Sequence, residues 1–195
     1  MKKSTLSEFA RMLCVLAFAG LIPAFTSVAK AQVLATVGFY QDPNDSGVKH
    51  DAFRLIVDYS KSLDAMIAAG EYDVVVPTNA SFELKADGGK EAVLTAKLIH
   101  FKNAASSTDA IALMKKDGGR PAKIEELLAL GSQWRVLQQK YRIAALGSVA
   151  LEGGTLVVPC LMGDDRHRIY LVRPYNTTWE GGNDGIRFLE IKTGK

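Results

Sequence analysis

The stretch GGRPAKIEELLALG, residues 118–131, joins two predicted helices in the middle of the chain. Its apolar residues at helical spacing are Ile124, Leu127 and Leu128. This pattern predicts a helix that buries the apolar stripe and exposes Glu125 and Glu126 near its positive end. Pro121 fits the first turn of that helix, because the position needs no backbone N–H donor, and Gly131 closes it.

The same glycines could instead form a phosphate-binding loop. Such a loop needs several consecutive backbone N–H groups together with a suitably placed lysine and hydroxyl. The segment GGRPAK lacks that spacing, and Pro121 removes a donor. We therefore interpret residues 119–121 as a scaffold joint between two helices.

The segments that flank this stretch alternate between strand and helix patterns. Upstream are a strand from Phe53, a helix from Leu63, strands at 72–76 and 91–101, and a helix that Ser106 and Asp109 begin as a capping box. Gly70 is expected to supply the left-handed residue that ends the first helix. Downstream, a short helix at 132–140 precedes four strand candidates at 141–150, 155–162, 168–173 and 186–192.

The connections between the last strands are mostly short, which favours antiparallel neighbours in a meander or a related sheet. The predicted fold class is α+β. An N-terminal strand-helix-strand region is followed by two or three helices packed on an antiparallel sheet.

The beginning of the chain has the pattern of a secretory signal. Basic residues precede an apolar run that ends at Ala29-Lys30-Ala31. An uncleaved membrane anchor is the alternative, but Pro23 interrupts a run about as long as the shortest spanning helices. The predicted organisation is a signal peptide at 1–31, a linker at 32–52 and a single domain at 53–195. The protein is then exported to the periplasm or secreted, without a stable membrane anchor.

Removal of the signal changes the charge and the cysteine content. The chain has 24 Lys and Arg against 21 Asp and Glu, and residues 1–31 hold four of the former and one of the latter, which leaves 20 of each. A neutral chain gives no compositional support to a nucleic-acid partner. Cys160 remains as a lone thiol among apolar residues, which favours a buried and inert group over pairing between chains.

The region 106–192 carries a family resemblance. Two helices joined by GGRPAKIEELLALG precede YRIAALGS, loops around Trp179 and a closing GIRFLEIK. This order resembles the C-type-lectin-like fold. It is similar in particular to the bacterial branch related to formylglycine-generating enzymes, where an R-P-[AT]-x-x-E-[LW] helix start and a terminal [GY]-[FI]-R-[FV] strand surround a loop-rich ligand face. The sequence of this region also resembles uncharacterised bacterial proteins that carry the motif R-P-A-x-x-E-E-L-L-A-L-G.

The chemistry of those relatives is not carried over. Formylglycine-generating enzymes depend on a cysteine-based copper site, and calcium-dependent lectins use E-P-N or Q-P-D followed by W-N-D; the chain has neither set. Leu146-Gly147-Ser148-Val149 is no nucleophile elbow, and the isolated histidines lack zinc-site spacing. His100 is interpreted as structural. No catalytic residue, metal or cofactor is predicted.

Two polar connections are the candidate ligand-binding segments. The turn at 163–168 could present mixed charge and an imidazole to a ligand, although Asp and Gly there also favour a plain solvated turn. The segment 175–179 combines aromatic, amide and hydroxyl groups, which suit a carbohydrate or protein surface, while Trp179 could equally be a core anchor. The candidate residues, expected around one shallow surface, are Asp165, Arg166, His167, Tyr175, Asn176 and Trp179.

These features predict an exported, noncatalytic binding or interaction module that uses its C-terminal loops. Its partner would be a glycan or an envelope protein. The alternatives are an envelope enzyme with Asp165 and His167 as an acid–base pair, or a structural envelope component that assembles through Cys160.

Overall fold

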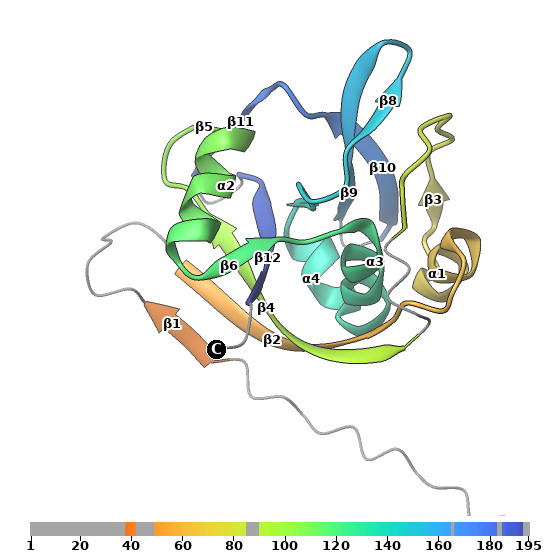
Figure 1. Ribbon diagram of the computed structural model, residues 1–195, viewed down its shortest axis with the longest axis horizontal. Coiled ribbons are helices and arrows are strands. Elements are labelled where there is room, and N and C mark those ends of the chain that lie inside the picture. Colours follow the sequence, from red (N-terminus) through yellow and green to blue (C-terminus); the bar gives the residue numbers. More distant parts are fainter. Residues whose placement is uncertain (1–37, 42–48, 85–89, 165, 183–184, 193–195) are drawn as a thin grey trace, which may run out of the picture. The chain divides into compact units, whose positions relative to one another are not determined.

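The computed structural model describes residues 38–41, 49–84, 90–164, 166–182 and 185–192 (Figure 1). The predicted signal peptide at 1–31, Asp165 and part of the predicted linker at 32–52 lie outside the described residues. Within those ranges, no helix has both the length and the apolar character needed to cross a membrane.

Four helices and twelve strands are described. The helices are α1 (Leu63–Gly70), α2 (Ser107–Lys116), α3 (Ile124–Gln133) and α4 (Arg135–Lys140). The strands are β1 (Gly38–Gln41), β2 (Lys49–Asp58), β3 (Val74–Val75), β4 (Glu91–His100), β5 (Ala105–Ser106), β6 (Gly119–Pro121), β7 (Ile143–Ala144), β8 (Ala150–Glu152), β9 (Thr155–Gly163), β10 (Arg168–Pro174), β11 (Thr178–Trp179) and β12 (Arg187–Lys192).

The main sheet has ten strands, and eight of them follow the order β1-β2-β4-β12-β7-β9-β10-β3. β6 pairs with β12, and β8 pairs with β9. Most pairs are antiparallel, but β12 runs parallel to β7, and β10 runs parallel to β3. The α+β class is confirmed. Of the predicted C-terminal antiparallel strands, β7, β9 and β10 are neighbours as expected. The last strand departs from the prediction, because β12 lies between β4 and β7 and not beside β10.

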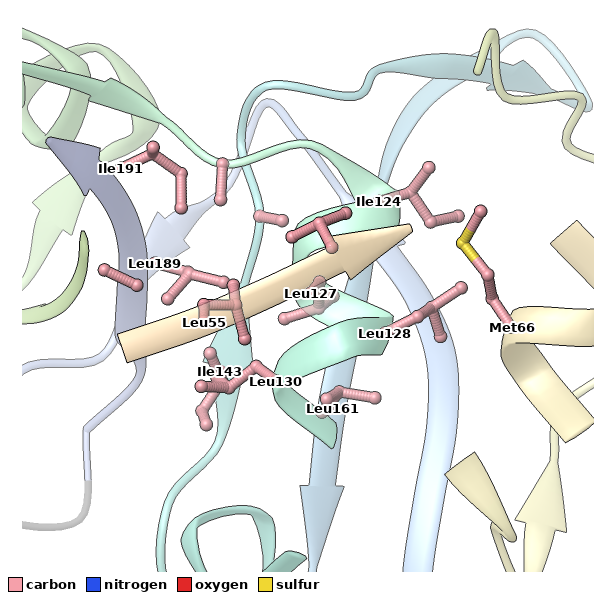
Figure 2. Packing of buried hydrophobic residues seen from close by; sticks show 14 of the residues in the cluster. Leu55, Met66, Ile124, Leu127, Leu128, Leu130, Ile143, Leu161, Leu189 and Ile191 are labelled. Carbon is pink, nitrogen blue, oxygen red and sulfur yellow. The ribbon is translucent and has the colours of Figure 1, made fainter. Parts of the chain in front are cut away.

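One face of the sheet carries the larger hydrophobic core. Alternate residues of β2, namely Phe53, Leu55 and Val57, point into it and are buried, as the sequence pattern predicted. The leucine stripe of α3 packs on the same face, and Figure 2 shows Leu127, Leu128 and Leu130 beside Leu55 and Leu161. Burying such side chains is the main favourable contribution to folding.

The opposite face carries a second core beneath α2. Ala110 and Met114 of this helix pack with Ile99, Phe188 and Trp179. The predicted capping box at the start of α2 is confirmed, since Ser106 and Asp109 exchange side-chain and backbone hydrogen bonds. The main sheet is therefore buried between two helical layers over part of its area.

The joint at 119–121 is a strand and not the first turn of a helix. Gly119, Arg120 and Pro121 pair with Lys192, Ile191 and Glu190 of β12, and α3 begins only at Ile124. The chain thus passes from α2 on one face to α3 on the other through the plane of the sheet. Pro121 is compatible with this strand because the strand is only three residues long and its end needs no further donor.

The two glutamates that were predicted to face water are buried instead, with exposed fractions of 1% for Glu125 and 0% for Glu126. The Glu126 carboxylate accepts hydrogen bonds from the Lys123 backbone N–H, from the Tyr59 hydroxyl and from both terminal nitrogens of Arg120. A buried carboxylate is tolerated when several donors satisfy it in this way. Lys123 and Arg120 are close to Glu126 in the sequence, but the sequence pattern could not reveal the Tyr59 donor, which lies 67 residues away.

The start of the fold also differs from prediction. β2 begins at Lys49, before the expected start at Phe53, and Gly38–Gln41 pairs with it as β1. Part of the predicted linker at 32–52 therefore belongs to the sheet.

Two glycines make room for the ring of Tyr72 between α1 and α3. A Cβ atom on Gly70 would lie 2.2 Å from the Tyr72 ring, and one on Gly131 would lie 2.2 Å from the Tyr72 hydroxyl. Gly70 is the last residue of α1, and the left-handed residue predicted there is in fact Glu71, with φ of 48°. Close helix packing, not backbone freedom, accounts for both glycines.

We expect Gly131→Ala to lower the free energy of unfolding by roughly 1–3 kcal/mol, because its Cβ would overlap Tyr72 and lie 2.8 Å from Leu161 Cδ1. Tyr72→Phe removes the atom that overlaps most, and the Tyr72 hydroxyl has no hydrogen-bond partner among the described residues. Urea unfolding of the two single variants and the double variant should show a smaller cost of Gly131→Ala in the Phe background. Equal costs in both backgrounds would contradict this packing.

Candidate functional site

The predicted site residues lie at two ends of one strand. Arg166 and His167 precede the first residue of β10, whereas Tyr175, Asn176 and Trp179 follow its last residue, Pro174. A strand of seven residues spans about 20 Å. The expectation that these residues surround one shallow surface is therefore wrong, and Asp165 lies outside the described part of the chain.

The turn before β10 is held by its own hydrogen bonds. Asp164 Oδ1 accepts from the backbone N–H groups of Arg166 at 2.8 Å and His167 at 2.7 Å. These bonds, that of Arg166 first, hold the pKa of the Asp164 carboxyl below its ordinary value. The His167 ring nitrogen Nδ1 lies 3.4 Å from the same oxygen, and both side chains are exposed. This geometry is typical of a solvated turn.

Trp179 is a core anchor. It is only 3% exposed, and its ring meets Phe188 edge to face at a centroid distance of 5.7 Å. The indole N–H donates to Ser107 Oγ at 2.8 Å, and the Ser107 hydroxyl donates to the Tyr175 carbonyl at 2.6 Å. Ser107, at the first turn of α2, therefore fixes both ends of the segment 175–179. Within that segment, Asn176 remains exposed.

A small pocket of about 70 Å³ opens beside this anchored segment. It lies on the α2 side of the sheet, because Cys160 and Arg173, which line it, share a strand face with residues of the second core. The polar residues that line it are Arg142, Arg173, Thr177, Thr178 and Glu180. Among the predicted site residues that the structure describes, Trp179 alone borders this pocket.

Backbone contacts position one arginine and the acid beside it. The Arg142 carbonyl accepts from the Arg187 N–H at 2.7 Å, just before β7, and the Glu180 carbonyl accepts from the Ile186 N–H at 3.1 Å. Their side chains then meet as an ion pair, with 2.8 Å between Arg142 Nη2 and Glu180 Oε2. Gly181 follows without a side chain because a Cβ there would lie 2.2 Å from the Asn103 carbonyl oxygen.

The other arginine lies on the same strand face as the thiol. Leu171 pairs with Cys160, so Arg173, two residues further along β10, projects from the same face. Among the described residues, Arg173 has no hydrogen bond or ion pair. Burial raises the pKa of the Cys160 thiol to about 12, although the positive charge of Arg173 opposes that shift. The thiol is therefore protonated at neutral pH.

The sequence analysis named residues at both ends of β10 but missed three charged residues that line the pocket. Arg142, Arg173 and Glu180 are each isolated along the chain and match no motif. Only the strand register places them together. The alternation of β10 gives the face of Arg173, but nothing local indicates that Arg142 lies across from it.

A second charged cluster joins the end of α2 to the sheet. Asp117 forms ion pairs with Lys97 at 3.2 Å and Lys192 at 2.5 Å, and Lys192 also pairs with Glu190 at 3.2 Å. Burial raises the pKa of the Glu190 carboxyl. The acids and lysines balance each other, and we interpret this cluster as a structural link.

His100 and metal binding are the two remaining possibilities that the sequence analysis considered. His100 is 8% exposed, and its Nε2 is hydrogen-bonded with the Gly182 carbonyl. Across the described residues, no group of three or more His, Cys, Asp or Glu side chains could hold a metal ion.

We expect Ser107→Ala to lower the free energy of unfolding by roughly 1–3 kcal/mol, because it leaves the buried Trp179 indole N–H and the Tyr175 carbonyl without this partner. Thr108→Ala is the matched control. It changes an exposed side chain in the same helical turn and should cost within about 0.5 kcal/mol. Chemical unfolding curves of both variants test the role of Ser107, which would be refuted by equal costs.

We expect the native protein to resist alkylation at Cys160. With a pKa of about 12, roughly one thiol in ten thousand is ionised at pH 8, and the side chain is also buried. Iodoacetamide labelling, followed by mass spectrometry of the peptide that contains Cys160, should show little modification before unfolding in urea and complete modification afterwards. Rapid labelling of the folded chain would show that the thiol is accessible.

Comparison with known proteins leaves these observations to stand on their own. No protein-family model, no curated protein and no solved structure matches the chain.

Proposed function

We propose that the protein is an exported, noncatalytic binding module whose ligand site is the pocket beside Thr177–Glu180. One observation carries the proposal: polar groups from β10, from the segment before β7 and from the segment after β10 converge on a pocket whose base is apolar. Ligand sites typically combine such a base with a few placed polar groups.

A binding role suits the residues around the pocket better than catalysis does. The Cys160 thiol is protonated and buried, and the Ser107 hydroxyl is engaged with Trp179 and Tyr175. His167, which the enzyme alternative requires, lies at the other end of β10. A nucleophile needs an adjacent base, and no histidine is among the described residues that line the pocket.

Export is the part of the proposal that rests on the sequence alone, through the signal pattern at 1–31. The proposed partner is accordingly a glycan, an envelope protein or a smaller compound of the periplasm or the exterior. We also propose the C-type-lectin-like relationship for residues 106–192, supported by the motifs at Arg120–Leu127 and Gly185–Phe188.

Trp179 provides a direct test of the site. The chain has two tryptophans, and uniform ¹⁵N labelling should give two indole resonances, which a Trp134→Phe variant assigns. A panel of glycan fragments, amino acids, organic acids and envelope peptides should contain a compound that shifts the Trp179 resonance saturably. Ligands that instead shift only the backbone resonances of Arg166 and His167 would move the site to the other end of β10.

A further inference from the structure

The charges of the pocket indicate the chemical class of its ligand. We propose that the pocket binds an oxyanion, a carboxylate or a phosphate group of a small ligand, and that the Glu180 carboxylate occupies Arg142 until the ligand displaces it. This inference rests on the proposed function, because it names the ligand class of the same site.

Arg173 carries the first step of the inference. Arg173 is exposed and lines the pocket, and its side chain has no hydrogen bond or ion pair within the described part of the chain. Its charge acts on the pocket floor, since it opposes the rise in the pKa of Cys160. A guanidinium offers a planar set of donors that matches the oxygens of a carboxylate or phosphate. The pocket therefore has a cation that an anionic ligand could pair with at no cost in broken protein contacts.

The neutral donors and the small size of the pocket also support the binding of a small anionic group. The hydroxyls of Thr177 and Thr178 make no hydrogen bond within the described residues, so both can donate to a ligand oxygen. A volume of about 70 Å³ holds a group of only a few non-hydrogen atoms. The anionic group would enter the pocket, and the remainder of the ligand would extend into solvent.

Arg142 is the second cation, and Glu180 already gives it the partner that a ligand would provide. The side chain of Arg142 is 36% exposed and that of Glu180 is 74% exposed. An exposed pair contributes little to stability, because water screens its attraction. The backbone of Glu180 is held by Ile186 and by buried Trp179, so the carboxylate can leave Arg142 by side-chain rotation alone. Glu180 thus competes with the ligand and sets its affinity.

The test uses the full chain with ¹⁵N-labelled indoles, titrated with sodium acetate and separately with sodium phosphate, at an ionic strength held constant with sodium chloride. We expect a saturable shift of the Trp179 resonance with at least one of the two anions, and the comparison of the two identifies the carboxylate or the phosphate as the preferred group. Arg173→Gln should weaken binding about tenfold or more, because it removes a charge-assisted hydrogen bond. Glu180→Gln should tighten binding about two- to fivefold.

Arg166→Gln is the matched control, because it removes an exposed arginine at the other end of β10, and it should leave the affinity unchanged. Thermal melts establish that each variant is folded. Saturation by an anion that Arg173→Gln does not weaken, or that Glu180→Gln does not tighten, overturns the inference. If neither anion shifts Trp179 while a neutral compound of the panel does, the ligand class is wrong and the proposed function stands. If no compound shifts Trp179, both fail.

Discussion

The rest of the fold is arranged around β12, because this strand is buried on both faces and paired on both edges. Four consecutive residues, Phe188 to Ile191, are buried. One edge pairs with β4, while β7 and β6 share the other. A strand of this kind requires a helical layer on each face, and α2 and α3 provide them. The chain must therefore cross the sheet between these two helices, and the three residues of β6 make that crossing.

The crossing explains why charged groups are buried near it. Arg120 of β6 donates hydrogen bonds to the Glu126 carboxylate in the first turn of α3. The same carboxylate accepts from the Lys123 N–H and from the hydroxyl of Tyr59, which follows β2. On the other face, Asp117 at the end of α2 forms ion pairs with Lys97 of β4 and Lys192 of β12. Both helix ends are thus joined to the sheet by ion pairs, and loss of Arg120 would carry the larger penalty, because the Glu126 carboxylate is fully buried while Asp117 is partly exposed.

The candidate site follows from what α2 leaves uncovered. The face of β9 and β10 that bears Cys160 and Arg173 continues beyond that helix, and the segment after β10 returns across it to pair with β5. Ser107 holds this returning segment through Trp179 and Tyr175. The pocket lies between the segment and the strands, so the backbone of its polar residues belongs to elements that are joined to the core. Such support favours recognition of a small group by preset donors.

The sequence by itself determined the α+β class, the buried face of β2, the capping box of α2 and the burial of Cys160. Each of these features depends on residues that are close in the sequence, within one or two helical turns or along one strand. The local pattern there favours the same structure as the packing of the folded protein. Only the tertiary structure decided that 119–121 is a strand, that Glu126 is buried and that Arg142, Arg173 and Glu180 line one pocket. A three-residue strand has no periodicity to read, Glu126 is satisfied by Tyr59 from 67 positions away, and the pocket depends on strand order and register. Pairing partners distant in the chain leave no local pattern, because the energy that selects them exists only in the folded sheet.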